Sequence, residues 1–336
     1  MMKKILLIAL LSLGSGVFAQ ESKLSLDINL AYFFPSLEGY GSTGFFSGPG
    51  YPTVDNPSPT ATQFKSMGGS VGAPGVEGVL NYSYTLPFLT GSGVLFEGNN
   101  LSINTWASMT PVSFFGAGQI ILTPLALLKF RAGIGAGWGW SPLGLKGLGV
   151  NSDGEKAPDS FKGRLIQGWG AGTFQFDFGA VFPGDWNHVV TVVDLNLQAQ
   201  QYSDADSKTP WFWKADFGEN FNGLKLIGTY FLGYQLPEGM PVSLLGILTS
   251  SEAYLGDAAN LSPMSSGFGS DFIYWTSGPM VNLKFSDFSS LVILIQVQDR
   301  RKYTPSTAFE KLFTNRTYEG SVVEFNRFVL SWTQKL

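Results

Sequence analysis

The most constraining feature of this sequence is the alternation of apolar and polar residues across residues 173–201. Two segments, separated by a break at 183–185, each carry one row of oily residues at every second position. These rows are Phe174, Phe176, Phe178, Ala180 and Phe182 in the first segment, and Val193, Leu195, Leu197 and Ala199 in the second. Successive side chains of a β-strand point to opposite faces, with a period of two. The stretch therefore predicts a hairpin with one apolar face and one polar face.

The same alternation recurs along most of the chain and predicts about twelve strands, give or take two. The predicted strands cover residues 24–32, 80–86, 101–105, about 120–122, 126–140, 162–182, 188–202, 222–236, 241–251, 270–285, 289–303 and 318–333. The connections alternate in length. Short connections fall near 87–93, 123–124, 183–187, 237–240 and 286–288; long ones fall at 33–75, 141–161, 203–221, 252–269 and 304–317, and the exception is a short link at 109–111.

The first residues of the chain include two lysines, an apolar run at 5–13 and a small-residue ending at Ala19. This pattern predicts a secretory signal peptide over residues 1–19, followed by a single domain over 20–336. No later segment offers the roughly 20 uninterrupted apolar residues of a transmembrane helix. Charged residues make up only 14% of the chain, below the usual quarter for a soluble domain, and cysteine is absent. The net charge of −4 and the lack of a long basic run argue against a nucleic-acid partner.

Short turns at one side, long loops at the other and an even strand number resemble the bacterial outer-membrane β-barrels. This resemblance covers nearly all of the chain after residue 19. It implies an all-β, antiparallel, up-and-down transmembrane barrel in the bacterial outer membrane, with the oily rows facing lipid. The rival fold is a soluble β-sandwich, in which the same rows would meet in a core.

Two places break the alternation. Gly168, Gly170 and Gly172 share parity with Phe174, which predicts a bulge near Gly172 if glycine is to be kept off the lipid face. In the last strand, Val323 and Phe325 differ in parity from the oily residues after 327, which predicts a second bulge near Asn326.

If the oily rows face lipid, the alternate rows line the interior. The candidate pore-lining residues are Lys129, Arg131, Asp177, Asp194, Gln198, Lys284, Gln296 and Gln298. A barrel of about twelve strands predicts a narrow pore or a solute-sized cavity, because eight strands are filled by side chains and sixteen to eighteen leave an open channel. The leading function is passive uptake of small polar solutes. The alternatives are a surface adhesin acting through its long loops and, more remotely, an outer-membrane hydrolase.

Signals for enzymatic or metal chemistry are weak. The glycines at 133–139 superficially suggest a phosphate loop, but no helix follows them, and they predict a smooth strand face that leaves room in the lumen. The sole histidine, His188, follows a short turn, opposite the long loops where barrel hydrolases place theirs. Asp204 and Asp206 are too few to claim a calcium site. The aromatic segment at 39–60 is an expected constriction, binding surface or mobile loop. No catalytic residue, cofactor or metal is assigned.

Overall fold

The computed structural model describes residues 21–34, 73–93, 95–142, 145–151, 159–182, 184–214, 216, 218–308, 310 and 312–336. The predicted signal peptide and the segment at 39–60 lie outside these ranges. Twelve of the described strands form one barrel. They are β1 (Glu21–Phe33), β2 (Ala73–Pro87), β3 (Asn100–Thr110), β4 (Ser113–Leu125), β5 (Leu128–Gly139), β7 (Leu165–Asp177), β8 (Val189–Tyr202), β10 (Gly223–Gln235), β11 (Val242–Leu255), β12 (Tyr274–Lys284), β13 (Ser289–Tyr303) and β14 (Tyr318–Lys335).

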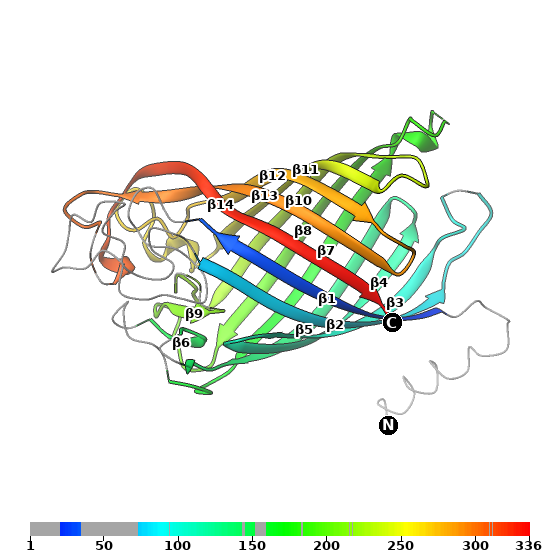
Figure 1. Ribbon diagram of the computed structural model, residues 1–336. Coiled ribbons are helices and arrows are strands. Elements are labelled where there is room, and N and C mark those ends of the chain that lie inside the picture. Colours follow the sequence, from blue (N-terminus) through cyan, green and yellow to red (C-terminus); the bar gives the residue numbers. More distant parts are fainter. Residues whose placement is uncertain are drawn as a thin grey trace, which may run out of the picture.

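The barrel is antiparallel and closed. Each strand pairs with its neighbours in chain order, and β1 closes the sheet by pairing with β14 over nine residue pairs, from Ser25 opposite Lys335 to Phe33 opposite Arg327. Figure 1 shows this seam as the blue β1 beside the red β14. Closure leaves no sheet edge with unpaired backbone groups. The predicted up-and-down barrel of about twelve strands is confirmed.

The oily rows lie on the outside of the barrel. Large hydrophobic side chains are exposed on strands all around it, including Leu30, Leu80, Ile103, Ile120, Phe130, Ile134, Leu195, Leu232, Ile247, Ile295 and Val323. Their strand neighbours face inward and are more buried, as Asp194 is beside Leu195. A soluble sandwich would bury these rows between two sheets, so the outward apolar face excludes that fold. It is the lipid-facing band of a membrane barrel.

The predicted bulge near Gly172 is wrong. Strand β7 pairs with β5 and with β8 in unbroken register, so Gly168, Gly170 and Gly172 share the outer face with Phe174. A Cβ atom built on Gly170 has no atom within 4 Å. The glycines therefore leave a shallow stripe on the lipid face, which costs β7 side-chain contacts but creates no clash.

The predicted bulge near Asn326 is confirmed. Gln296 pairs with Arg327 and Val297 pairs with Phe325, which leaves Asn326 as the extra residue of β14. Its carbonyl oxygen accepts a hydrogen bond of 2.8 Å from the amide of Phe34. Val323 and Phe325 are exposed before the bulge, and Trp332 is exposed after it. The extra residue thus keeps both halves of β14 with their oily row outward.

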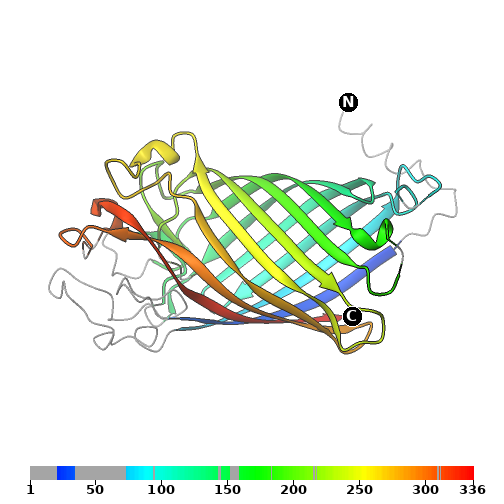
Figure 2. The same cartoon turned by 90° about the horizontal axis from the view of Figure 1, so that it is seen from above.

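The two ends of the barrel differ. At one end, here the short-turn end, connections of two to twelve residues join the strands, and the C-terminus lies there (Figure 1). One of these connections carries a 3-10 helix at Phe178–Ala180, where the sequence predicts a continuing strand. The other end, the long-loop end, carries the long connections seen in Figure 2 and also the two-residue link between β3 and β4. No helix in the described ranges is long and apolar enough to cross a membrane.

At the long-loop end, two connections fold against each other. Strand β6 (Leu148–Val150), from the β5–β7 connection, pairs with β9 (Trp211–Trp213), from the β8–β10 connection. Leu148 of β6 and Trp211 of β9 form a buried apolar cluster with Leu165 and Tyr202. These connections are therefore packed structures with their own small core, positioned at the mouth of the barrel.

Candidate functional site

Arg131 and Asp194, both predicted to face the lumen, form an ion pair on one wall of the interior. Arg131 Nη2 on β5 lies 2.5 Å from Asp194 Oδ1 on β8, and Thr173 on the intervening β7 donates a 2.6 Å hydrogen bond to Asp194 Oδ2. Three neighbouring strands thus share one carboxylate. The pair neutralises its own charge, so it contributes less to the field in the lumen than two separate charges would.

Gln296 and Gln298 lie on the opposite wall and are almost completely buried. Gln296 accepts a 2.8 Å hydrogen bond from Arg327 Nε and donates one of 3.2 Å to Thr276. Gln298 accepts a 2.6 Å bond from the Tyr274 hydroxyl and donates one of 2.9 Å to Glu324. These amides hold neighbouring polar groups of β12, β13 and β14 in fixed positions.

The remaining predicted residues are more scattered. Lys129 and Gln198 lie in the inward rows of β5 and β8. Asp177 and Lys284 lie instead at the short-turn end, where Asp177 is 2.7 Å from His188 Nδ1 and Lys284 is 2.8 Å from Asp287. Lys284 is exposed at the rim because β12 ends at that residue. The role of the eight predicted residues in lining a pore stays a prediction.

The glycine row of β5 faces inward, but aromatic side chains occupy the space beside it. A Cβ on Gly133 would come within 2.4 Å of the Trp169 ring, and one on Gly135 within 2.4 Å of Phe115. A Cβ on Gly137 would meet Trp213 of β9 at 2.7 Å. The sequence predicts room here for a loop or a solute. On this wall, aromatic rings occupy that room, and one of them comes from the loop strand β9.

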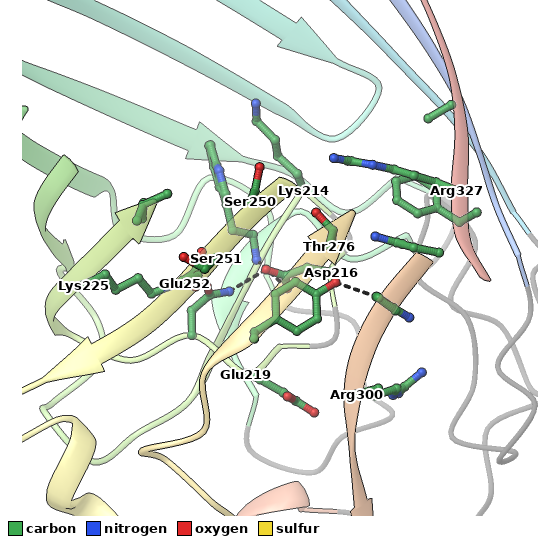
Figure 3. Close-up of a pocket in the computed structure, with 18 of the residues that line it drawn as sticks. Lys214, Asp216, Glu219, Lys225, Ser250, Ser251, Glu252, Thr276, Arg300 and Arg327 are labelled. Atoms are coloured by element: carbon green, nitrogen blue, oxygen red, sulfur yellow. Dashed lines mark hydrogen bonds and ion pairs between the residues drawn. The ribbon is translucent and has the colours of Figure 1, made fainter. Parts of the chain in front are cut away.

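A cavity of about 750 Å³ lies inside the barrel toward the long-loop end. It is bordered by β1, β2 and β10 to β14 and by the connection that follows β9 (Figure 3). The charged side chains that line it are Glu77, Lys214, Asp216, Glu219, Lys225, Glu252, Arg300, Arg301 and Arg327. A cavity of this volume lies within the range of roughly 300 to 1,000 Å³ that small-molecule sites occupy. We treat it as the candidate solute site.

Most charges of the cavity are paired within the protein. Lys214 Nζ lies 2.5 Å from Glu77 Oε1, and this contact ties the loop after β9 to strand β2. Arg300 lies 3.5 Å from Glu324. Lys225 pairs with Glu252, and Arg301 with Glu219. These ion pairs come from five strands and one loop, so they fix the shape of the cavity wall.

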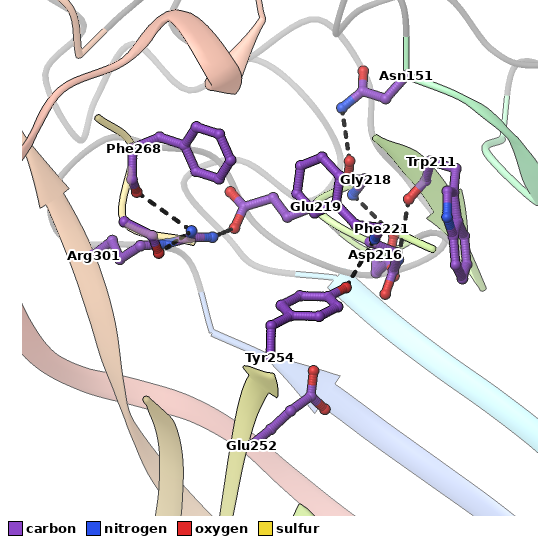
Figure 4. Close-up of polar contacts among 12 residues, drawn as sticks. Asn151, Trp211, Asp216, Gly218, Glu219, Phe221, Glu252, Tyr254, Phe268 and Arg301 are labelled. Atoms are coloured by element: carbon purple, nitrogen blue, oxygen red, sulfur yellow. Dashed lines mark hydrogen bonds and ion pairs between the residues drawn. The ribbon is translucent and has the colours of Figure 1, made fainter. Parts of the chain in front are cut away.

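Asp216 organises the loop between β9 and β10. Its Oδ1 accepts hydrogen bonds from the amides of Trp213 (3.0 Å) and Gly218 (2.9 Å), and its Oδ2 accepts one of 2.5 Å from Asn220 (Figure 4). Burial raises the pKa of Asp216 to about 6, against these three donors, which favour the ionised form. The charge of this cavity residue is therefore lost as the pH falls through about 6.

An aromatic cluster holds the loops together at the mouth. Phe221, Phe268 and Phe313 come from three different connections, and the rings of Phe268 and Phe313 meet edge to face with centroids 4.9 Å apart. Arg301 lies over both of these rings, and it donates a 3.0 Å hydrogen bond to the carbonyl of Gly269 (Figure 4). Phe221, Phe268 and Arg301 also line the cavity, so this cluster forms part of the cavity wall.

The carboxylates of Asp204 and Asp206 accept hydrogen bonds from neighbouring residues of their own loop. Asp206 accepts hydrogen bonds from the amide of Lys208 and the hydroxyl of Thr209, both at 2.8 Å, and Asp204 accepts one from Ser203. Within the described part of the chain, no group of three or more histidine, aspartate or glutamate side chains is arranged to hold a metal ion.

Sequence reasoning missed most of this cavity. Lys214, Asp216 and Glu219 fall in a segment predicted only as a long loop, and nothing local in the sequence shows that this loop turns back into the barrel. A signal for Lys225 was present, because Leu224 and Leu226 flank it in the oily row just as Leu128 and Phe130 flank Lys129. The same parity rule places Arg327 inward, once the bulge at Asn326 is allowed for.

A closed antiparallel barrel with an apolar exterior and a polar interior defines the class of bacterial outer-membrane β-barrel proteins. This chain has that architecture, and its place is the outer membrane. No protein-family model matches the chain, and no curated protein matches it significantly in sequence.

Solved structures similar to the chain include three outer-membrane barrels. The KdgM porin shares 10% identity at a TM-score of 0.38, over 93% of this chain and 99% of the porin. The OmpT protein of Vibrio cholerae shares 10% at 0.38, over 96% of this chain and 99% of OmpT. A bacterial polysaccharide outer membrane secretin shares 7% at 0.40, over 93% and 98%. The class assignment rests on the closed sheet and its apolar band, to which these distant similarities add no weight.

Proposed function

We propose that the protein is a narrow outer-membrane channel for passive uptake of small polar solutes, which enter through the charged cavity at the long-loop end. The observation that carries this proposal is the cavity itself, about 750 Å³ in volume, enclosed by the barrel wall and lined by side chains of both charge signs. Charges on facing walls create a transverse field that orients a polar solute.

The inward rows closer to the short-turn end also favour a hydrated interior. The side-chain oxygens Asp27 Oδ1, Asn104 Oδ1, Asn196 Oδ1 and Asn282 Oδ1 are buried and accept no hydrogen bond from any described protein group. A buried acceptor without a partner is costly, whereas water in a polar lumen supplies the donor. Aromatic rings fill the facing wall around Trp106 and Trp169, whose centroids lie 5.6 Å apart. The expected path of the solute is therefore narrow and runs along the polar side of the interior.

Conductance in a planar bilayer tests this proposal. The purified folded protein is expected to give discrete current steps in potassium chloride, and liposomes containing it are expected to swell in small sugars or amino acids. Boiled protein is the control, because an unfolded chain forms no barrel. If the folded barrel passes no current and admits no solute, the channel proposal fails.

The second candidate is a surface adhesin that acts through the long connections. The packed cluster of Phe221, Phe268 and Phe313 gives the mouth a defined surface rather than a set of free loops, which is the feature an adhesin would need. The same cluster also borders the cavity. Absence of current, together with binding of the folded protein to host-cell surfaces, would favour this candidate.

A further inference from the structure

We propose that the solute of this channel carries a carboxylate group and that Arg327 is the residue that binds it. The inference rests on the proposed function, since it names the chemical class of solute that the cavity admits. Arg327 comes from β14, on the wall opposite the loop that bears Asp216, and Figure 3 shows its side chain reaching into the cavity.

Arg327 differs from the other basic side chains of the cavity in its partners. Five basic side chains line the cavity, and Lys214, Lys225, Arg300 and Arg301 each have a carboxylate partner. Within the described part of the chain, Arg327 has no carboxylate within ion-pairing distance. Its one hydrogen bond to another side chain runs from Nε to Gln296.

The Gln296 contact orients the guanidinium group and leaves its outer edge available. Gln296 is 1% exposed and is itself fixed by Thr276, so Nε of Arg327 is anchored to a rigid neighbour. The two terminal nitrogens of Arg327 form no hydrogen bond with any described group. A guanidinium held through Nε presents these two nitrogens as a planar fork, which matches the two oxygens of one carboxylate.

The bulge at Asn326 makes this placement possible. Before the bulge, the odd-numbered residues of β14 face lipid, and an unbroken strand would turn Arg327 outward with Val323 and Phe325. The extra residue reverses the phase, so Asn326 and Arg327 both line the cavity. Bulges commonly re-aim a side chain beside a functional site.

Electrostatics favours an anionic ligand at this position. A charge that is partly withdrawn from water and lacks a counter-charge is costly, and the cost is relieved by an ion that binds it. One unpaired guanidinium matches one carboxylate. Aromatic side chains, among them Phe33, Phe221 and Phe272, also line the cavity. Benzoate is therefore a suitable probe, and benzamide is its uncharged counterpart of nearly the same shape.

The test is calorimetric titration of the folded barrel in detergent micelles at pH 7.5 with benzoate and with benzamide. Wild-type protein is expected to bind benzoate about tenfold or more tightly than benzamide, the difference that a charge-assisted contact supplies. Arg327→Gln is expected to remove this preference. Lys129→Gln is the matched control, because it removes the same charge from the inward row outside the cavity, and it should change benzoate affinity less than about twofold.

Each other outcome decides against the inference. If Arg327→Gln and Lys129→Gln weaken benzoate binding equally, the lumen acts through its overall field and Arg327 is no specific site. Equal binding of benzoate and benzamide by wild-type protein overturns the proposal directly. Should Arg327→Gln fail to fold, as judged by loss of its heat-dependent gel shift, Arg327→Lys replaces it. That variant keeps the charge but loses the fork, and unchanged benzoate affinity would then count against the proposal.

Binding in micelles does not require permeation, so the two proposals can fail separately. A barrel that binds benzoate through Arg327 but conducts no current retains the carboxylate site and loses the channel function. A barrel that conducts but shows no preference for benzoate retains the channel function and loses the carboxylate site.

Discussion

At the scale of single residues, the chemistry of this protein depends on which charges are paired. Arg131 and Asp194 are joined across the lumen wall, and Lys225 is joined to Glu252. Asp216 and Arg327 have no ionic partner among the described residues, although hydrogen bonds orient both. The paired charges hold the interior in shape, whereas Asp216 and Arg327 can respond to pH or to a solute.

Asp216 is expected to make the ion preference of the channel depend on pH. Its pKa of about 6 means that the side chain is ionised at pH 7.5 and largely neutral at pH 5. Acidification removes one negative charge from the cavity, so anion preference should increase. The measurement is the reversal potential under a potassium chloride gradient at both pH values.

Asp216→Asn is the control for this pH effect. It is expected to show the anion preference of acidified wild-type protein at both pH values. A pH shift of equal size in the variant would assign the effect to another group. The same raised pKa means that Asp216 stabilises the fold most below its ordinary value of 3.8, and this contribution is lost as pH rises through about 6.

Glycines on the two faces of the wall should respond oppositely to enlargement. Gly133→Val inserts atoms where Trp169 and Gln119 already lie, so we expect it to destabilise the barrel by about 1–3 kcal/mol. Gly170→Val adds an apolar side chain toward lipid with no atom in its way, and its effect should be neutral or favourable by up to about 1 kcal/mol. The urea concentration at the unfolding midpoint, measured in micelles, reports the stability change of each variant. Equal loss in the two variants would contradict the outward orientation of Gly170.

At the scale of elements, strand β14 changes parity at the bulge at Asn326. It is the longest strand, from Tyr318 to Lys335, and it pairs with β13 and β1. Its two halves have opposite parity, which could be read from the sequence because Val323, Phe325 and Trp332 are all large and apolar. The absence of a bulge in β7 could not be read in this way, because glycine is compatible with either face.

Deleting Asn326 should leave the fold of β14 intact. The deletion removes the extra residue and keeps Phe325 opposite Val297 and Arg327 opposite Gln296. We expect the loss of one hydrogen bond from Phe34, about 1 kcal/mol, and retention of the heat-dependent gel shift.

Deleting Val329 is the comparison, because it falls in a regular part of β14 and reverses the parity of one half. A one-residue slip moves every side chain of that half to the wrong face. This variant is expected to fold poorly or not at all. If both deletions are tolerated equally, the bulge is not what reconciles the two halves.

At the scale of the whole molecule, the barrel could be predicted from the sequence, whereas the cavity could not. Strand alternation is a local property with a period of two, so it could be read segment by segment. The cavity depends on contacts between distant segments, such as Lys214 with Glu77 and Arg301 with Glu219. Such contacts follow only when the sheet has closed and the loops have packed at its mouth.

The orientation of the barrel in the membrane is testable because the chain has no cysteine. The long-loop end is expected to face the cell exterior. Lys208→Cys, in an exposed part of the β8–β10 connection, should react with an impermeant thiol reagent on intact cells. Asp185→Cys, at the short-turn end, should react only after the outer membrane is broken. Labelling in the reverse pattern would invert the barrel.

The bulge at Asn326 also has a consequence for how related sequences should vary. In a barrel wall, neighbouring positions along a strand are exposed to different solvents, so natural selection acts on two interleaved sets of positions. In homologous chains, substitutions at outward positions should exchange one apolar residue for another, while inward positions should vary with the solute. Along β14 the odd positions should follow the first rule before Asn326 and the even positions after it. Inherited variation should therefore change phase at that residue.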